Sequence, residues 1–290
     1  MRGIFANEMS VGDAVAWGAT ALDESDICCV NSRADATLML RQVLGLSAAQ
    51  LHVEWERQLT QQQTQQYNVM LRRRQTGEPL QYILGVQEFF GLPFRVTPAV
   101  LIPRPETEHL VEAAIVRLRS MEQPRILDVG TGSGAIAVAL AHSLPASRLT
   151  AVDISGAALR LAEQNAKENG VAHRIRFVES DLMPAVQAET FDAIVSNPPY
   201  IAMGERKQLP VEVRDFEPEQ ALFAGASGLE IIERLVHAAP ASLAPGGWLL
   251  MEIGYNQRDA VAGLLRPWNA VEFLPDLQGI PRVAIAQRPR

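Results

Sequence analysis

One short segment of this 290-residue chain combines residue types that could hold a nucleotide-like ligand. Residues 128–135 read Asp-Val-Gly-Thr-Gly-Ser-Gly-Ala and lie between an apolar run and a stretch with helical spacing. Glycines at a strand end let the backbone turn sharply and bring its N–H groups close to a ligand, and open α/β sheets bind nucleotides at such turns. Asp153 ends the next apolar run, where its carboxylate could accept hydrogen bonds from both hydroxyls of a ribose. The loop therefore predicts an adenosine ligand.

The glycine spacing leaves the identity of that ligand open. Gly130, Gly132 and Ala135 also satisfy the dinucleotide fingerprint, and Asp153 suits NAD as well. Asp128 favours a different ligand, because an acid two residues before three alternating glycines resembles the first motif of S-adenosylmethionine-dependent methyltransferases. In those enzymes the loop accommodates the methionine part of the cofactor.

A second segment, Asn197-Pro198-Pro199-Tyr200, follows the apolar run 191–196. Two prolines fix φ at about −65° and remove two backbone donors, which leaves the Asn197 side-chain oxygen and the Pro198 carbonyl as rigid acceptors. These acceptors, with Tyr200 as an aromatic wall, suit a planar NH2 group conjugated to a π system, as in an amide, an adenine or a cytosine. Binding both hydrogens orients the nitrogen lone pair toward an electrophile held about 3–3.5 Å away. The chemistry needs neither a metal nor a carboxylate base.

Elements of alternating type must position these two segments. Strand-like apolar runs occur at 126–129, 149–153, 175–178, 191–196, 248–253, 270–274 and 282–286, and helical stretches at 134–143, 156–169 and 256–265. Alternation of strand and helix predicts a parallel sheet covered on both faces, because parallel neighbours need crossover connections.

The first part of the chain has a different pattern. Residues up to 84 have helical spacing, with Gly45 as a stop for the helix 33–44 and Ser47 as a cap for the next. The triplet Arg72-Arg73-Arg74 is expected on a solvated helix face. Glycines and prolines punctuate residues 85–105, which predicts a β-hairpin linker. We therefore expect a helical bundle at 1–84, a linker at 85–105 and a catalytic domain at 106–290.

Charge and composition exclude several classes of protein. The net charge is −7, with −2 before residue 100 and −5 after it, so neither part has the basic excess of a protein that binds bulk DNA. Apolar runs are shorter than a membrane helix needs, and the N-terminus has no apolar signal core. Cys28 and Cys29 are adjacent and poorly placed for a disulfide. We expect a cytoplasmic protein that is not bound to membranes, and the scattered histidines suggest no metal site.

The chain resembles the PrmC/HemK family of protein-(glutamine-N5) methyltransferases. The resemblance runs from about residue 30 to the C-terminus and rests on residues 77–96, 101–112, 128–141, 195–201 and 216–222. It implies a Rossmann-like, seven-stranded class I methyltransferase domain of the α/β class, preceded by a small helical bundle and a β-hairpin. It also implies S-adenosyl-L-methionine as cofactor and the glutamine of the GGQ motif of class 1 peptide-chain release factors as substrate, with the helical bundle docking the release factor.

The resemblance assigns roles to residues that match the family's motifs. The implied cofactor contacts are Gly130, Thr131, Gly132, Ser133, Gly134, Asp153, Leu182 and Asn197. The implied catalytic and substrate-binding residues are Asn197, Pro198, Pro199 and Tyr200. The segment 104–107 lies beside the active site in the family.

Three other functions compete with this interpretation. An adenine-N6 methyltransferase acting on DNA or RNA would use the same two motifs but should carry a basic recognition surface. A nicotinamide dehydrogenase would need an acid–base group for hydride transfer, and none accompanies the loop. A non-catalytic module that binds release factors would not need an intact segment 197–200.

Overall fold

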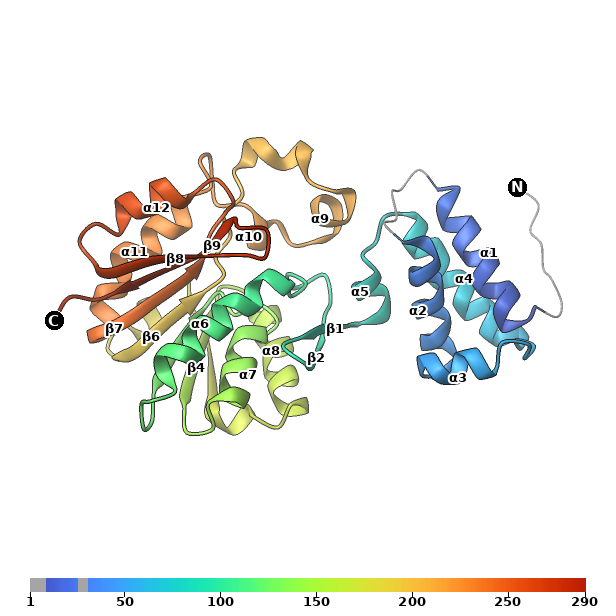
Figure 1. Cartoon of the computed structure of the whole chain (residues 1–290), viewed down its shortest axis with the longest axis horizontal. Coiled ribbons are helices and arrows are strands. Elements are labelled where there is room, and N and C mark those ends of the chain that lie inside the picture. Colours follow the sequence, from blue (N-terminus) through green and yellow to red (C-terminus); the bar gives the residue numbers. More distant parts are fainter. Residues whose placement is uncertain (1–8, 26–30) are drawn as a thin grey trace. The chain divides into compact units, whose positions relative to one another are not determined.

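The computed structural model describes residues 9–25 and 31–290, so Cys28 and Cys29 lie outside the described residues. The described chain divides into two compact units, labelled by element in Figure 1. One unit contains the helices up to Gly85 together with the distant segment Pro210–Phe216, and the other contains Val86–Leu209 and Glu217–Arg290. No helix within the described ranges is long and apolar enough to cross a membrane.

The first unit is built from short helices whose ends carry the expected caps. Its elements are α1 (Val11–Asp23), α2 (Ser32–Leu44), α3 (Ala48–Val53), α4 (Gln61–Gln75), α5 (Leu80–Leu84) and α9 (Val211–Phe216). Gly45 ends α2 in the left-handed conformation, and Ser47 caps α3 through a capping box with Gln50. Tyr67 is buried among these helices and donates its hydroxyl to the carbonyl oxygens of Ala14 and Ala36 at 3.3 and 3.2 Å.

The arginine triplet of α4 is not uniformly solvated, so the expectation of a solvated face is wrong for Arg74. Arg72 is exposed, whereas Arg74 is 4% exposed. Its guanidinium contacts Asp35 Oδ2 of α2 at 2.7 Å and Glu212 Oε1 of α9 at 2.5 Å. Two carboxylates compensate the buried charge, and one of them comes from the segment that is distant in sequence.

We expect the substitution Arg74→Ala to destabilise this unit by about 3 kcal/mol or more, because it leaves Asp35 without its buried partner. Arg72→Ala on the same helix is the matched control and should change stability by less than about 0.5 kcal/mol. Thermal and urea unfolding followed by circular dichroism measures both effects. Equal stability of the two variants would contradict the structural role of Arg74.

The second unit begins with the expected β-hairpin. Strands β1 (Val86–Phe89) and β2 (Leu92–Arg95) pair antiparallel around a turn in which Phe90 and Gly91 both have positive φ. The chain then passes through the 3-10 turn η1 (Pro105–Thr107) into helix α6 (Glu108–Leu118). In the structure the hairpin belongs to the second unit by its contacts.

The structure describes every residue of 86–290, and in this range seven strands form one sheet in the order β5-β4-β3-β6-β7-β9-β8. The strands are β3 (Arg125–Val129), β4 (Arg148–Asp153), β5 (Ile175–Glu179), β6 (Phe191–Ser196), β7 (Leu243–Glu252), β8 (Asn269–Pro275) and β9 (Pro281–Gln287). Strands β3 to β7 pair in parallel, but β9 runs antiparallel to both β7 and β8. The expectation of a parallel sheet is therefore confirmed for β3 to β7 and wrong for β9. No crossover helix separates β8 from β9, and a short turn can join only antiparallel strands.

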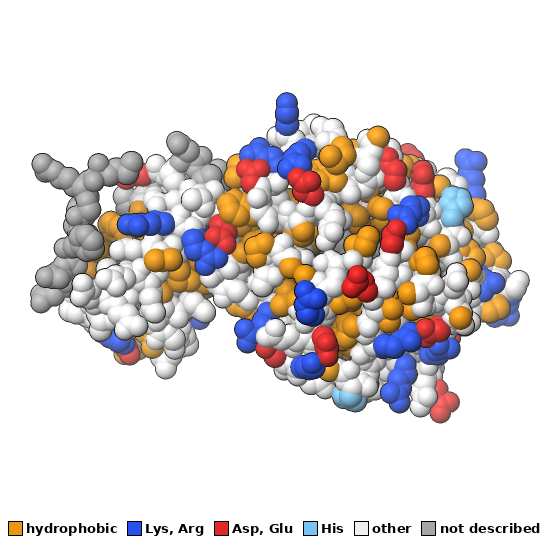
Figure 2. Space-filling view, turned by 180° about the vertical axis from the view of Figure 1, so that it is seen from behind, with side chains coloured by type: hydrophobic (Ala, Val, Ile, Leu, Met, Phe, Trp, Pro, Cys, Tyr) orange, Lys and Arg blue, Asp and Glu red, His pale blue; other side chains and the backbone are white. Residues whose placement is uncertain are grey.

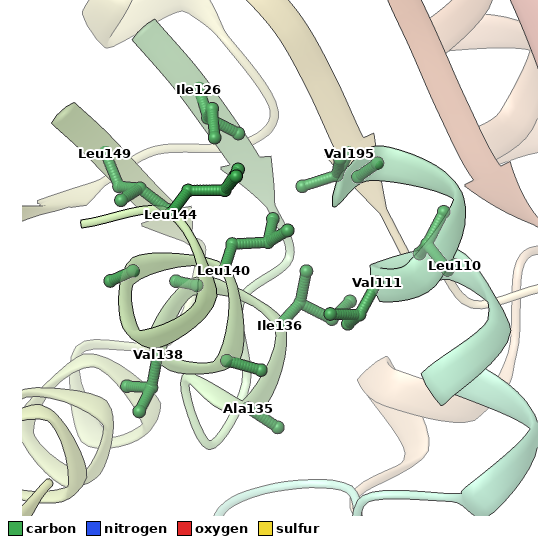
Figure 3. Packing of buried hydrophobic residues seen from close by; sticks show 14 of the residues in the cluster. Leu110, Val111, Ile126, Ala135, Ile136, Val138, Leu140, Leu144, Leu149 and Val195 are labelled. Carbon is green, nitrogen blue, oxygen red and sulfur yellow. The ribbon is translucent and has the colours of Figure 1, made fainter. Parts of the chain in front are cut away.

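Helices cover both faces of the sheet, as the alternation predicts. The long helices are α6, α7 (Ala135–Ser143), α8 (Gly156–Glu168), α11 (Glu230–Ser242) and α12 (Arg258–Leu264), with the short α10 at Glu219–Leu222. Ile126 packs with α6 and α7 on one face, while its neighbour Leu127 packs with α11 and α12 on the other. Figure 3 shows Val111 of α6 beside Ile136 of α7 in the first of these layers. The strand ends that carry the two motifs are thus fixed from both sides.

Candidate active site

The pairing of β3 with β6 brings the two sequence motifs together. Val129 is the register partner of Ser196, so the glycine loop leaves β3 at the level where residues 197–200 leave β6. Ser196 reinforces the pairing by donating its hydroxyl to the Val129 carbonyl oxygen at 2.7 Å. The chain proceeds from β3 to β4 on one side and returns to β6 on the other, and ligands bind at such a switch point in open α/β sheets.

The three glycines of the loop serve two different purposes. Gly130 and Gly132 have φ of 73° and 55°, and a Cβ built on either would meet no atom within 4 Å. Their backbone is thus open to an approaching ligand. Gly134 has φ of 82°, but its Cβ would lie 3.0 Å from the Ala162 Cβ of α8. Gly134 allows α7 to begin close to α8.

Asp153 connects β4 to the glycine loop. Its Oδ2 accepts a hydrogen bond from the Gly132 N–H and its Oδ1 one from the Ser155 N–H, both at 2.8 Å. Burial raises the pKa of Asp153, and these backbone donors oppose the rise. The carboxylate holds the loop in place and retains lone pairs for a further donor.

A cavity of about 370 Å³ lies above these strand ends, which is a normal size for a small-molecule site. It brings together Gly130, Thr131, Gly132, Ser133, Asp153, Leu182, Asn197, Pro198 and Pro199, while Gly134 and Tyr200 are outside its lining. Leu182 has a positive φ of 61°, which is rare for a leucine. Asp181 and Arg234 also line the cavity and form an ion pair at 2.8 Å.

Residues 197–200 are held by hydrogen bonds from several elements. Asn197 Nδ2 donates to Thr107 Oγ1 at 3.0 Å, and the Tyr200 hydroxyl donates to Glu252 Oε1 at 3.2 Å. The Tyr200 carbonyl oxygen accepts from Gln257 Nε2 at 2.9 Å. Tyr200 thus anchors the segment through its hydroxyl and its carbonyl. Burial, followed by the charge of Glu252, raises the pKa of its phenol well above the usual value.

Two carboxylates near the cavity, Glu217 and Glu252, are not among the residues expected from the sequence, whereas Arg104 and Thr107 belong to the segment 104–107 that the resemblance places beside the active site. Arg104, which lines the cavity, forms an ion pair with the buried Glu217, and Glu217 also accepts a hydrogen bond from the Ile102 N–H at 3.3 Å. Glu252 ends β7, buried behind the segment 197–200. A buried carboxylate at a strand end is a recognisable signal, but only the fold shows which groups it contacts. The described residues contain no group of three or more potential metal ligands of the His, Cys, Asp and Glu types.

Asp128 lies beneath the loop, fully buried, and accepts a hydrogen bond from Thr131 Oγ1 at 2.6 Å. Burial raises its pKa to about 7, although the Thr131 hydroxyl and the Ala137 N–H oppose the rise. Between the ordinary carboxyl pKa of about 4 and this value, the folded chain keeps a proton that the unfolded chain has lost. Asp128 therefore contributes stability that is complete below about pH 4 and is lost as the pH rises toward 7.

We expect Asp128→Asn to gain stability relative to the wild type as the pH rises from about 4 to about 7. The neutral amide removes the titration, and one pKa unit corresponds to about 1.4 kcal/mol. Urea denaturation at several pH values measures the free energy of unfolding of both proteins. Parallel pH profiles would show that Asp128 does not titrate in this range.

Comparisons with known proteins agree with this geometry. Residues 107–213 match the family model described as methyltransferase small domain, and residues 13–85 match the PrmC N-terminal domain. A protein of Koribacter versatilis named release factor glutamine methyltransferase is 46% identical over 258 residues, covering 89% of this chain and 91% of its own. One of the same name from Geobacter sulfurreducens is 43% identical, covering 87% and 88%.

Among solved structures, a T. thermophilus 16S rRNA methyltransferase in complex with AdoMet and guanosine has a TM-score of 0.53 and 21% identity, covering 70% of this chain and 49% of that one. At this identity the likeness shows the fold, which is that of a class I methyltransferase. The two relatives extend over nearly all of the chain. The chain belongs to the release factor glutamine methyltransferase family.

Proposed function

We propose that this protein transfers a methyl group from S-adenosyl-L-methionine to the side-chain amide nitrogen of a release-factor glutamine, the one in the GGQ motif. The observation that carries the proposal is the register of β3 and β6. It places a loop suited to an adenosine ligand beside acceptors suited to an amide, along one cavity. The names of the relatives support the release factor as substrate.

The residues of the glycine loop fit the proposed cofactor. Gly130 and Gly132 leave their backbone open toward the cavity, and the Asp153 carboxylate can accept the ribose hydroxyls in addition to its two backbone donors. Leu182, with its left-handed backbone, provides an apolar wall on the adenine side. Asn197 lines the boundary between the cofactor and the substrate amide.

The proline-rich segment orients the substrate amide. Asn197 Oδ1 and the Pro198 carbonyl oxygen accept its two hydrogens, and Tyr200 stiffens the end of the segment. When bound, S-adenosyl-L-methionine would supply a methyl group on a sulfonium, and its sulfur would leave as a neutral thioether when the amide nitrogen takes the methyl group. The nitrogen then loses its extra proton to water or to the carbonyl acceptor. Because the electrophile is already activated, the residues of this chain act mainly by positioning.

The charge distribution does not favour the nucleic-acid alternative. On the face shown in Figure 2, the Lys and Arg side chains are interspersed with Asp and Glu. The net charge of the chain is −7. A DNA or RNA methyltransferase needs basic contacts to phosphates, so we propose that this protein does not bind nucleic acid directly.

We further propose that the helical unit docks the release factor in the cytoplasm, where translation factors act. The match of residues 13–85 to the PrmC N-terminal domain supports the assignment of release-factor docking to this unit. Hydrogen exchange of the full chain, with and without a recombinant release factor, tests the proposal. Added protection in α1 to α4 would support docking, and protection confined to the second unit, Val86–Leu209 and Glu217–Arg290, would contradict it.

The activity is tested by incubating the protein with methyl-labelled cofactor and a recombinant release factor, then locating the label by mass spectrometry. We expect one methyl on the glutamine of the GGQ motif and none on a release factor in which that glutamine is replaced by alanine. Labelling of an adenine-containing DNA or RNA instead would overturn the proposal.

A further inference from the structure

A chain of hydrogen bonds links the proposed acceptor Asn197 to a buried carboxylate. Asn197 Nδ2 donates to Thr107 Oγ1 at 3.0 Å, and Thr107 Oγ1 donates to Glu252 Oε2 at 2.6 Å. The three residues come from the end of β6, the turn before α6 and the end of β7. Thr107 is 4% exposed and Glu252 is 2% exposed. The hydrogen bonds between these three side chains are therefore shielded from water, which would otherwise compete for their donors and acceptors.

The donor and acceptor chemistry of these groups determines the direction in which each of these hydrogen bonds is donated. Burial raises the pKa of Glu252, and the hydrogen bonds from Thr107 and Tyr200 oppose the rise. In its ionised form the carboxylate accepts hydrogen bonds only, so the single hydrogen of the Thr107 hydroxyl points to Glu252. The hydroxyl oxygen is then left as an acceptor for Asn197, and only the NH2 arm of an asparagine amide can donate to it. Tyr200 donates to the second oxygen of Glu252 and leaves this direction unchanged.

The direction matters because an asparagine amide has two arms of similar size. Rotated by 180°, Asn197 would place its oxygen against the lone pairs of the Thr107 hydroxyl and its NH2 group on the opposite side. In the observed orientation Nδ2 is occupied by Thr107, and Oδ1 accepts no hydrogen bond from the described residues. The oxygen arm is thus left for a donor in the cavity, which Asn197 lines.

We propose that Thr107 and Glu252 are positioning residues, which hold the Asn197 amide with its oxygen toward the substrate NH2 group. The inference rests on the proposed function and adds the means by which its principal acceptor is oriented. Without the hydrogen bonds through Thr107 to Glu252, the Asn197 amide samples both orientations. In one of them its NH2 group faces the NH2 group of the substrate amide, and no hydrogen bond can form. The loss then falls on the rate of methyl transfer, since the glycine loop and Asp153 hold the cofactor independently.

Three variants of the full chain test the positioning role. Thr107→Val keeps the shape of the side chain and removes the acceptor, and we expect kcat to fall roughly 10- to 100-fold. Glu252→Gln keeps the size of the side chain but can donate to Thr107, which permits the reversed chain, so a fall in the same range is expected. Thr107→Ser retains the hydroxyl and should stay within about threefold of the wild type. The cofactor dissociation constant, measured by calorimetry, should change less than about threefold in all three.

A double-mutant cycle with Asn197→Ala separates positioning from a general structural effect. If Thr107 acts through Asn197, Thr107→Val should cost nothing further when Asn197 is already alanine, measured as single-turnover methyl transfer. An equal loss in both backgrounds, or a wild-type rate for Thr107→Val alone, would overturn the inference. Absence of labelling by the wild type would instead count against the proposed function. Circular dichroism of each variant confirms that it is folded, and Glu252→Gln repeats the cycle if Thr107→Val does not fold.

Discussion

Replacing Asn197 with alanine is expected to reduce methyl transfer by roughly 10²- to 10⁴-fold while cofactor binding is partly retained. The substitution removes the side-chain acceptor, so the Pro198 carbonyl alone remains to bind the amide hydrogens. A substrate nitrogen held at one hydrogen can rotate its lone pair away from the methyl group, and loss of alignment of this kind costs orders of magnitude in rate. Single-turnover transfer of labelled methyl to a recombinant release factor measures the rate.

The matched control is Asn256→Ala, because Asn256 is exposed and lies outside the cavity lining. Its rate should equal that of the wild type. Calorimetric titration with the cofactor distinguishes the expected loss of chemistry from a loss of binding. If Asn197→Ala kept the full rate, the acceptor mechanism would be refuted. If it bound no cofactor, Asn197 would belong mainly to the cofactor site.

The parts of the site that are determined by residues adjacent in the sequence, namely the strand ends and the glycine turn, are predicted by local sequence patterns. The apolar runs before Gly130, Asp153 and Asn197 are strands of the sheet in the structure. Gly130, Asp153 and Asn197 lie close together because parallel strands end at the same edge of a sheet. Gly130 and Gly132 have the positive φ that the turn requires. For these residues, chemistry and spacing were sufficient.

Contacts between distant positions left no such pattern. Thr107 and Glu252 are 145 positions apart, and no feature near either residue indicates the other. The triplet pattern predicts a solvated Arg74, but its partners lie on two other helices, α2 and α9, that the local sequence does not indicate. The expectation of a parallel sheet does not include the antiparallel β9, although no helical stretch separates the runs 270–274 and 282–286. In each case the fold decides the partner, and the local sequence is compatible with several.

Replacing Asp153 with alanine is expected to weaken cofactor binding roughly 100-fold. A hydrogen bond to a charged group contributes about 1.5–3 kcal/mol, and the substitution removes the acceptor proposed for two ribose hydroxyls. It also releases the backbone N–H groups of Gly132 and Ser155, so the glycine loop loses its support. The dissociation constant, measured by calorimetry with S-adenosyl-L-methionine, reports the loss directly.

Two further variants determine how much of that loss comes from the carboxylate at this position. Asp153→Asn keeps one acceptor oxygen but places an NH2 group against a backbone donor, so its affinity should lie between those of the wild type and Asp153→Ala. Asp259→Asn removes an exposed carboxylate and should bind the cofactor normally. At saturating cofactor, Asp153→Ala should recover much of its rate, because Asn197 and its partners remain in place. An unchanged dissociation constant for Asp153→Ala would show that the ribose lies elsewhere in the cavity, and the assignment of the glycine loop to the cofactor would then fail with it.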